Sequence, residues 1–249
     1  MNILLTNDDG YKAEGINELY HFLKNSHDVM VIAPSTDKSG SSSSLTIRKQ
    51  IEATKISDNL IAVDGTPADC IYLGLNYFLA DRTPDLVISG INHGANLGDD
   101  IIYSGTFGGA LEGRNLCYPS IAISLDGRGD KYFETASLFI EKLINASHLL
   151  KPFSHTIFNI NVPDVAFSDL NGIKVVPHGR RHPSTELFLD SSIENSFQFT
   201  LGKAGSPISS EFEDDFQCLA NNYITMTPVS YNYNDESSLQ SLSKLMEKI

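Results

Sequence analysis

Short continuous apolar runs alternate with segments of helical periodicity along the first two thirds of this chain. The runs Ile3–Thr6 and Val29–Ala33 lie on either side of Glu14–Asn25, a segment whose apolar residues recur at helical spacing. A strand, a helix and a second strand in this order require a right-handed crossover, which makes the two strands parallel. We therefore predict an α/β fold with a doubly wound, mostly parallel sheet.

The alternation continues through the middle of the chain. Helices are predicted over Ala68–Leu79, over Thr106–Asn115 and within Tyr132–Leu149, and strands over Leu86–Ser89, Ser120–Ser124 and Thr156–Ile160. An inserted pair of strands is predicted over Thr46–Ile56 and Leu60–Val63, and a closing helix over Glu236–Glu247.

The segment from about residue 173 to residue 228 has apolar runs and turns of β type but no convincing helix. Within it, Glu186–Leu189 and Ser196–Leu201 are predicted to form the two arms of a hairpin. A hairpin that protrudes from a domain often serves contacts between subunits. We interpret residues 1–249 as a single domain with a C-terminal appendage, rich in β-hairpin structure, at about 173–228.

The balance of charge limits the partners of this protein. Eighteen Lys and Arg residues against thirty-one Asp and Glu residues give a net charge of −13. This excess repels nucleic-acid polymers and anionic membranes, so neither is an expected partner. It also repels a small phosphate substrate, unless a bound cation or backbone dipoles reverse the field at the site. A phosphate-handling protein of this composition therefore needs a metal ion or an anion-binding nest.

Three features of the sequence favour a cytoplasmic protein. Cys70, Cys117 and Cys218 are far apart, which is typical of buried apolar cysteines in a reducing compartment. The first apolar run has no basic flank and is interpreted as a strand, not as a signal peptide. No apolar run of about eighteen residues is present, so no membrane span is expected.

Asn7-Asp8-Asp9-Gly10 follows the first predicted strand directly. Ligand sites in open α/β sheets lie at the carboxyl ends of strands, and paired carboxylates there are costly unless they are hydrogen-bonded or bound to a cation. Their hard oxygen atoms suit magnesium, manganese or calcium better than zinc or copper. A type I turn, in which Asn, Asp and Gly are common, accounts for the same residues without a metal.

Two further polar segments follow predicted strands. Ser35–Ser44 could supply a neutral metal ligand and donors to phosphate, although a solvated serine-rich linker is the simpler explanation of this segment alone. Ser89–Asp100 is a long glycine-containing loop that runs on to Ser104-Gly105-Thr106 at the start of a predicted helix. Amides at a helix N-terminus attract anions, and the two hydroxyls could add donors, so we favour a functional role for this loop.

Together these motifs resemble the SurE survival-protein family, in order and over nearly the whole chain. They are TNDDG, SGSSSSLT, GTPADC, SGINHGANLGDDIIYSGTFGGALEG, GRRHP and YITMTP. The resemblance implies a Rossmann-like nucleotidase that hydrolyses 5′- and 3′-nucleoside monophosphates with one divalent metal ion, Mg²⁺ or Mn²⁺, per subunit. Because such a site reads the phosphoryl group more than its leaving group, short-chain polyphosphate is a second expected substrate.

The resemblance also implies roles for individual residues. The metal ligands are Asp8, Asp9, Ser39 and Asn92, and the phosphate-binding residues are Asn96, Ser104, Gly105 and Thr106. Asp8 and Asp9 are also the candidate catalytic residues, acting as nucleophile or as general base. Members of the family form dimers or tetramers through the C-terminal β-rich part, so a homodimer or homotetramer is expected here.

Other interpretations remain open at this point. A dinucleotide-dependent oxidoreductase is disfavoured, because no GxGxxG follows the first predicted strand. A non-catalytic nucleotide sensor would use the same metal-binding residues without turnover. His178 and His182 are spaced like a zinc pair on a helix, but Pro177 and Pro183 flank them, which favours a loop near the substrate. Gly108 and Gly109 are each expected to weaken the helix after Thr106 by about 1 kcal/mol.

Overall fold

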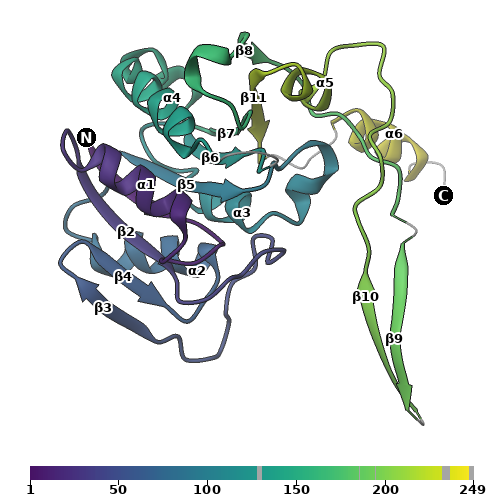
Figure 1. Ribbon diagram of the computed structural model, residues 1–249, viewed down its shortest axis with the longest axis horizontal. Helices are drawn as coiled ribbons and strands as arrows, with labels where there is room; N and C mark the ends of the chain where they lie inside the picture. Colours follow the sequence, from purple (N-terminus) through teal and green to yellow (C-terminus); the bar gives the residue numbers. More distant parts are fainter. Residues whose placement is uncertain (128–130, 185, 194, 232–235, 247–249) are drawn as a thin grey trace.

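The computed structural model describes residues 1–127, 131–184, 186–193, 195–231 and 236–246. Within these residues the chain forms a nine-stranded sheet of order β3-β4-β2-β1-β5-β6-β7-β11-β8 (Figure 1). Its strands are β1 (Asn2–Thr6), β2 (Asp28–Pro34), β3 (Ala53–Ser57), β4 (Leu60–Val63), β5 (Leu86–His93), β6 (Ser120–Leu125), β7 (Thr156–Val162), β8 (Gly172–Val175) and β11 (Tyr223–Ser230). The helices are α1 (Glu14–Leu23), α2 (Pro67–Leu73), α3 (Gly105–Glu112), α4 (Phe133–Asn145), α5 (Asp215–Ala220) and α6 (Glu236–Met246).

Most neighbouring strands are parallel, as predicted. Strands β4, β2, β1, β5, β6 and β7 run in one direction, while β3 and β11 are antiparallel to β4 and β7. β1 is an inner strand that pairs with β2 on one side and with β5 on the other, where Leu5 is opposite Ile88. The doubly wound, mostly parallel α/β fold is confirmed.

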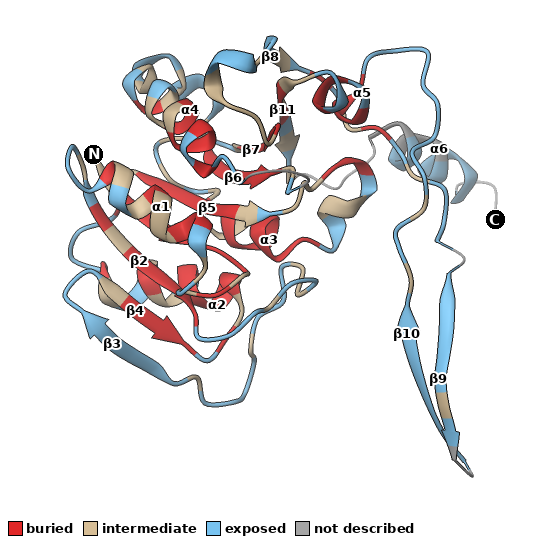
Figure 2. Ribbon diagram, in the orientation of Figure 1, coloured by how far each residue is buried: buried red, intermediate tan, exposed pale blue. Residues whose placement is uncertain are grey.

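Helices cover both faces of this sheet because successive side chains of a buried strand point to opposite faces. On β1, Ile3 and Leu5 belong to the core under α1 and α4, while Leu4 belongs to the core under α2. These three side chains are 1% exposed or less, and full burial of each such side chain contributes about 1.5–3 kcal/mol. Figure 2 shows the buried residues concentrated in the central strands and in the helix faces that meet them.

Several element boundaries differ from the predicted ones. The helix predicted over Ala68–Leu79 is α helical only to Leu73 and continues as a π-helical turn, Gly74–Phe78. β3 begins at Ala53, later than predicted. β5 runs on to His93. Gly90, at φ +133°, lies so close to β6 that a Cβ on it would be 2.2 Å from the carbonyl oxygen of Ile123, so the strand can continue past this point only with glycine.

The prediction that no helix lies between residues 173 and 228 is wrong. α5 is a six-residue helix whose N-cap, Asp214, accepts a hydrogen bond from the backbone N–H of Gln217 at 2.9 Å. In the same segment β8 and β11 join the main sheet, and only the hairpin of β9 (Leu187–Ile193) and β10 (Ser196–Leu201) stands away from it (Figure 1). The predicted hairpin is confirmed.

The remaining predictions of this kind have mixed outcomes. α6 confirms the predicted closing helix as far as Met246, and Glu247 lies outside the described residues. All three cysteines are free, but Cys117 is exposed, so the prediction that it is buried is wrong. In the described part of the chain, no helix is long and apolar enough to cross a bilayer.

Side chains at the start of α2 hold the loop that contains Thr46 in place. Thr66 and Asp69 form a capping box, in which each side chain accepts a hydrogen bond from the other's backbone N–H. The Asp69 carboxylate also accepts hydrogen bonds from the backbone N–H and the hydroxyl of Thr46, at 2.8 and 2.7 Å. Asp69 is 2% exposed, so these bonds are shielded from water.

We expect Asp69→Ala to lower the free energy of unfolding by about 2 kcal/mol, because the carboxylate's bond in the capping box and its two part-buried bonds to Thr46 are lost together. Urea denaturation measures the change. Asp58→Ala is the matched control, because Asp58 is fully exposed and its pair with Lys55 contributes little. Equal stabilities of the two variants would contradict this view of Asp69.

Candidate active site

The polar segments that follow β1, β2 and β5 meet at the carboxyl edge of the sheet. They meet because these three strands are neighbours in the order β2-β1-β5. The chain passes from β1 to β2 on one side and continues from β5 to β6 on the other. The gap between β1 and β5 is therefore the point where the strand order reverses, which is where α/β sheets bind ligands.

Asp8 is packed directly against the N-terminus of α3. Its side chain is buried, and its Oδ1 accepts a hydrogen bond from the Thr106 hydroxyl. Gly105 lies so close that a Cβ there would be 2.8 Å from the Asp8 Cβ and 2.9 Å from its Oδ2. Burial raises the pKa of Asp8 above its usual range, and the hydrogen bond from Thr106 opposes that rise.

Asp9 lies beside Asp8 and is half-buried. Its Oδ2 accepts a hydrogen bond from the backbone N–H of His93 at 3.1 Å, which ties β1 to the end of β5. Burial is the main cause that raises the pKa of Asp9 to about 6, and the charge of Asp8 adds to the rise. Both carboxylates are therefore in an environment that disfavours their ionised form, as expected where a cation is to be bound.

The serine-rich loop after β2 brings Ser39 to the same place. The backbone N–H of Lys38 donates to the carbonyl oxygen of Asp8 at 2.7 Å. One oxygen of Asp37 accepts hydrogen bonds from the Ser39 backbone N–H and from its hydroxyl, both at 2.7 Å. Because that hydroxyl donates its single proton to Asp37, Ser39 can offer only lone pairs to another partner, as a metal ligand must.

Sequence reasoning missed Asp37. The two hydrogen bonds from Ser39 lower the pKa of Asp37, so it adds a third negative charge close enough to Asp8 and Asp9 to act on their pKa values. The sequence feature that could have indicated this role is an Asp two residues before a Ser, which is the pattern of an Asx turn.

The end of β5 and the loop after it place two asparagines. Asn92 donates from Nδ2 to the carbonyl oxygen of Gly94 at 2.7 Å, which leaves its Oδ1 as the atom it can offer to a cation. The backbone of Asn96 is held by Asn161 and Asn159: its N–H donates to Asn161 Oδ1 at 2.8 Å, and its carbonyl oxygen accepts from both side-chain amides. Its Nδ2 donates to Ser124 Oγ at 2.9 Å. These bonds fix the loop above the ends of β6 and β7.

Ser104, Gly105 and Thr106 form the N-terminus of α3. Ser104 is the N-cap, and its Oγ accepts a hydrogen bond from the backbone N–H of Phe107 at 3.0 Å, which leaves its proton free to be donated. Thr106 already donates to Asp8. Ser104 and Gly105 therefore lie at the N-terminus of α3, while the Thr106 hydroxyl orients the carboxylate of Asp8.

The two glycines that weaken α3 have a packing role. A Cβ on Gly108 would lie 2.1 Å from the carbonyl oxygen of Ser42, so only glycine lets the serine-rich loop lie against the helix. A Cβ on Gly109 would lie 2.9 Å from both Ser89 Oγ, within β5, and Thr6 Cγ2, at the end of β1. The loss of helix propensity is the cost of bringing the helix, the loop and the sheet into contact.

Asp215, which sequence reasoning also missed, supports the loop after β5. Asp215 on α5 is fully buried and accepts hydrogen bonds from the backbone N–H groups of Gly98 and Gly179, each at 2.8 Å. His178 Nε2 lies 3.2 Å from Asn159 Nδ2, next to Asn96, so this histidine lies near the site as predicted. Burial lowers the pKa of His178 and raises that of Asp215.

The donor set fits a hard divalent cation. Asp8 and Asp9 supply carboxylate oxygens, Ser39 a hydroxyl oxygen without a free proton, and Asn92 an amide oxygen, all of which suit Mg²⁺ or Mn²⁺. Among the residues that the structure describes, no group of three or more His, Cys, Asp and Glu side chains gathers as a metal cluster. A metal at this site would therefore depend on neutral oxygens and water for the rest of its coordination.

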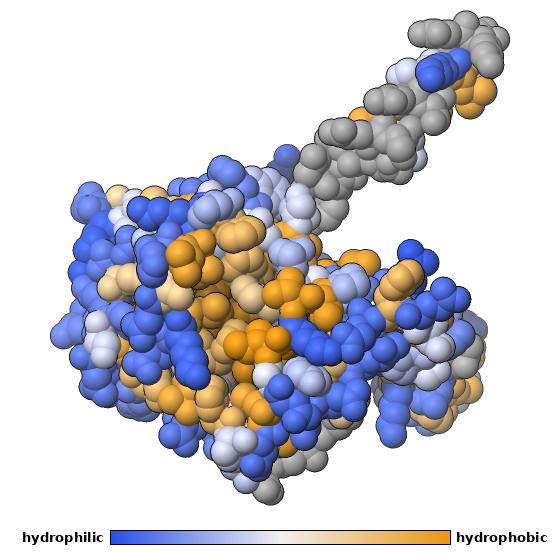
Figure 3. Space-filling view, turned by 90° about the horizontal axis from the view of Figure 1, so that it is seen from above, coloured by the Kyte–Doolittle hydropathy of each residue, from blue (hydrophilic) through white to orange (hydrophobic). Residues whose placement is uncertain are grey.

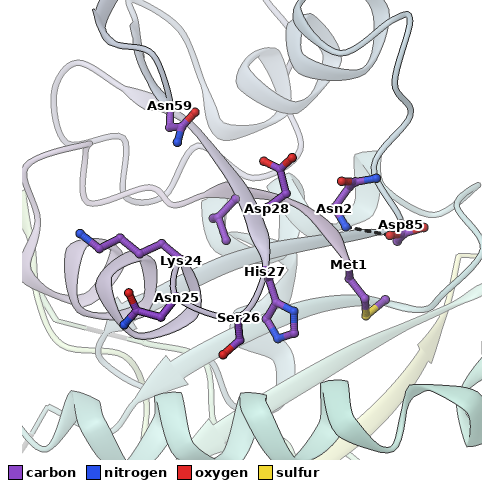
Figure 4. Close-up of a pocket in the computed structure, with 10 residues that line it drawn as sticks. Met1, Asn2, Lys24, Asn25, Ser26, His27, Asp28, Asn59 and Asp85 are labelled. Atoms are coloured by element: carbon purple, nitrogen blue, oxygen red, sulfur yellow. Dashed lines mark hydrogen bonds between the residues drawn. The ribbon is translucent and has the colours of Figure 1, made fainter.

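A surface depression of about 770 Å³ lies at the opposite edge of the sheet (Figure 4). It is lined by residues at the amino ends of β1 and β2, among them Asn2, His27 and Asp28, and by Asp85. The backbone N–H of Asn2 donates to Asp85 there, at 2.7 Å. Because α/β sheets bind ligands at the carboxyl ends of their strands, this depression is not the candidate site.

Comparison with known proteins gives one consistent result. Residues 3–185 match the protein family described as survival protein SurE. The 5′-nucleotidase SurE of Vesicomyosocius okutanii is 42% identical over 250 residues, which span 100% of this chain and 99% of that protein. The 5′/3′-nucleotidase SurE of Wigglesworthia glossinidia brevipalpis is 44% identical over 249 residues, spanning 99% and 98%. The crystal structure of the SurE protein from Aquifex aeolicus, 36% identical, matches with a TM-score of 0.86 over 99% of this chain and 100% of that one.

The raised pKa of Asp9 predicts how the stability of the metal-free protein depends on pH. Between its unfolded value and about 6, the folded state holds a proton that the unfolded chain has lost. The contribution of Asp9 to stability is therefore lost as the pH rises through this window. We expect Asp9→Asn to flatten the decrease in free energy of unfolding between about pH 4 and pH 6, measured by urea denaturation in EDTA. An identical pH dependence in the variant and the parent would contradict the burial of this carboxylate.

Proposed function

This chain belongs to the SurE family and is a 5′-nucleotidase, a phosphoric monoester hydrolase, and from that premise we propose how its site works. We propose that it removes the phosphate from 5′- and 3′-nucleoside monophosphates with one divalent metal ion, Mg²⁺ or Mn²⁺, per subunit. Short-chain polyphosphate is proposed as a second substrate, since the residues assigned here contact a phosphoryl group and not its leaving group.

One observation carries the metal dependence: the carboxylate of Asp8 is buried against a helix N-terminus that would also attract phosphate. Asp8, Asp9 and Asp37 place negative charge where a phosphate must bind, in a protein whose net charge is already −13. The negative charges of the carboxylates and of a phosphate repel one another at the N-terminus of this helix, and a cation between them would relieve that repulsion. This conflict supports a divalent ion held by Asp8, Asp9, Ser39 and Asn92.

The residues of the chain have separate tasks in this mechanism. When bound, the metal would neutralise phosphate charge and lower the pKa of water. The backbone N–H groups of Gly105 and Thr106 and the hydroxyl of Ser104 would hold the phosphoryl oxygens, with the helix dipole favouring the charge that develops on them. Asn96 is proposed to contact the phosphate from the loop after β5.

Asp9 is the better candidate for general base. One oxygen of Asp8 already accepts the Thr106 hydroxyl, and Asp8 is almost fully buried. Asp9 is only half-buried, so its carboxylate is more accessible to an attacking water. We therefore propose that Asp9 takes the proton of the attacking water.

We also propose a homodimer or homotetramer formed through the C-terminal β-rich region. On the hairpin, Leu187 and Leu189 pair with Leu201 and Phe199 to give one apolar face, and each of the four side chains is more than half exposed. A lone two-stranded hairpin is marginally stable in water. The described part of α6 stands clear of the body of the molecule (Figure 3), with Leu239, Leu242 and Leu245 exposed. A second copy of the chain is the proposed cover for these surfaces.

The proposed activity is tested by phosphate release from 5′- and 3′-nucleoside monophosphates and from tripolyphosphate, with Mg²⁺, with Mn²⁺ and with excess EDTA. We expect release only with metal, and we expect Asp8→Asn to reduce it at least about 100-fold because both a metal ligand and the charge beside α3 are changed. Asp58→Asn, on an exposed turn, is the control variant. Turnover that survives both EDTA and Asp8→Asn would overturn the metal mechanism, and nucleotide binding without turnover would favour a sensor.

The proposed assembly is tested with Leu189→Asp combined with Phe199→Asp, which places two charges on the apolar face of the hairpin. We expect a smaller assembly, measured by sedimentation velocity, because burial of these carboxylates against a partner is unfavourable. Asp190→Asn, on the opposite face where Thr200 donates to Asp190, is the control. An unchanged sedimentation coefficient in the double variant would exclude this face as the interface.

A further inference from the structure

The hydroxyl of Ser41 lies at the N-terminus of α3. A Cβ on Gly105, the first residue of that helix, would lie 2.6 Å from Ser41 Oγ and 2.9 Å from Asp8 Oδ2. Cα–Cβ bonds in a helix tilt towards its N-terminus, so Ser41 Oγ and Asp8 Oδ2 both lie on the N-terminal side of Gly105. This is the place where a phosphoryl group is proposed to bind.

This hydroxyl differs from its neighbours in the serine-rich loop. Ser39 donates to Asp37, Ser42 donates to the carbonyl oxygen of Ile102 at 2.7 Å, and Ser44 donates to the carbonyl oxygen of Ser41 at 2.8 Å. Ser41 Oγ is shielded from solvent and has no hydrogen-bond partner among the described residues. A buried polar atom without a partner is unfavourable and calls for an explanation.

The backbone holds Ser41 in place independently of its side chain. The N–H of Ser41 donates to the carbonyl oxygen of Lys38 at 3.1 Å, and the N–H of Lys38 donates to the carbonyl oxygen of Asp8 at 2.7 Å. The turn is therefore fastened to the end of β1, and the hydroxyl is fixed beside Asp8 and Gly105. No other hydrogen bond of the turn requires that hydroxyl.

We propose that Ser41 is a further substrate-binding residue, whose hydroxyl donates its proton to an oxygen of the phosphoryl group at the N-terminus of α3. This inference rests on the proposed function and deepens it. In this arrangement the loop has two distinct tasks: Ser39, whose proton is given to Asp37, offers lone pairs to the metal, and Ser41, whose proton is unused, offers a hydrogen bond to phosphate.

Ser41→Ala tests the proposal in the full-length protein. We expect kcat/KM for a nucleoside monophosphate to fall about tenfold, and the inhibition constant of inorganic phosphate to rise by a similar factor, because one hydrogen bond to the phosphoryl group is lost. The affinity for Mn²⁺, measured by calorimetry, is expected to stay unchanged. The melting temperature is expected to stay equal or rise, because a buried hydroxyl without a partner has been removed.

Ser43→Ala is the matched control, since Ser43 is an exposed serine of the same loop and is expected to change none of these quantities. Parent-like kcat/KM and phosphate inhibition in Ser41→Ala would overturn the role of Ser41 while leaving the proposed function intact. Weakened Mn²⁺ binding would also overturn it, by making Ser41 a metal ligand. Absence of metal-dependent phosphate release in the parent protein would instead refute the proposed function itself.

Discussion

The contact between Asp8 and the N-terminus of α3 determines how the rest of the site is built. A carboxylate at this position is stabilised by the helix dipole and by the Thr106 hydroxyl, yet its burial raises its pKa. The contact requires glycine at position 105, where any side chain would collide with Asp8. It also fixes α3 relative to β1, so the helix amides and the carboxylates share one small volume.

The same contact makes the empty site electrostatically unfavourable. Burial raises the pKa values of Asp8 and Asp9, and hydrogen bonds from Ser39 lower that of Asp37. The negative charge of Asp37 also acts on the other two carboxyl groups and adds to the rise of their pKa values. In the proposed mechanism a bound cation would relieve this repulsion and leave the helix N-terminus available for phosphate. The cost to the metal-free protein is then of the kind that is common where function requires strained or buried polar groups.

The parts that could be predicted from the sequence are those that depend on local pattern. β1 and β4 are continuous apolar runs because they are buried on both faces, and the pattern alone places them. α5 was missed because six residues give no helical period, and its stability comes from the cap of Asp214 and from the bonds of Asp215 to distant loops. Asp37 was missed because its role depends on a bond to Ser39 that only the folded turn reveals. In each case the missing information lies in contacts between segments far apart in the sequence or in the geometry of a single turn.

The C-terminal region is connected to the site through the base of the hairpin. Arg181 donates from Nε to Asp100 at 2.7 Å and from its guanidinium to the carbonyl oxygen of Gly205 at 3.0 Å, so one side chain joins the loop after β5 to both ends of the hairpin. Its guanidinium also lies over the ring of Phe216 on α5, 4.6 Å from the ring centroid. Asp215, the neighbour of Phe216, holds Gly98 of the same loop. The hairpin and the loop after β5 are therefore held by one set of contacts, and any surface that fixes the hairpin also restrains the loop that carries Asn96.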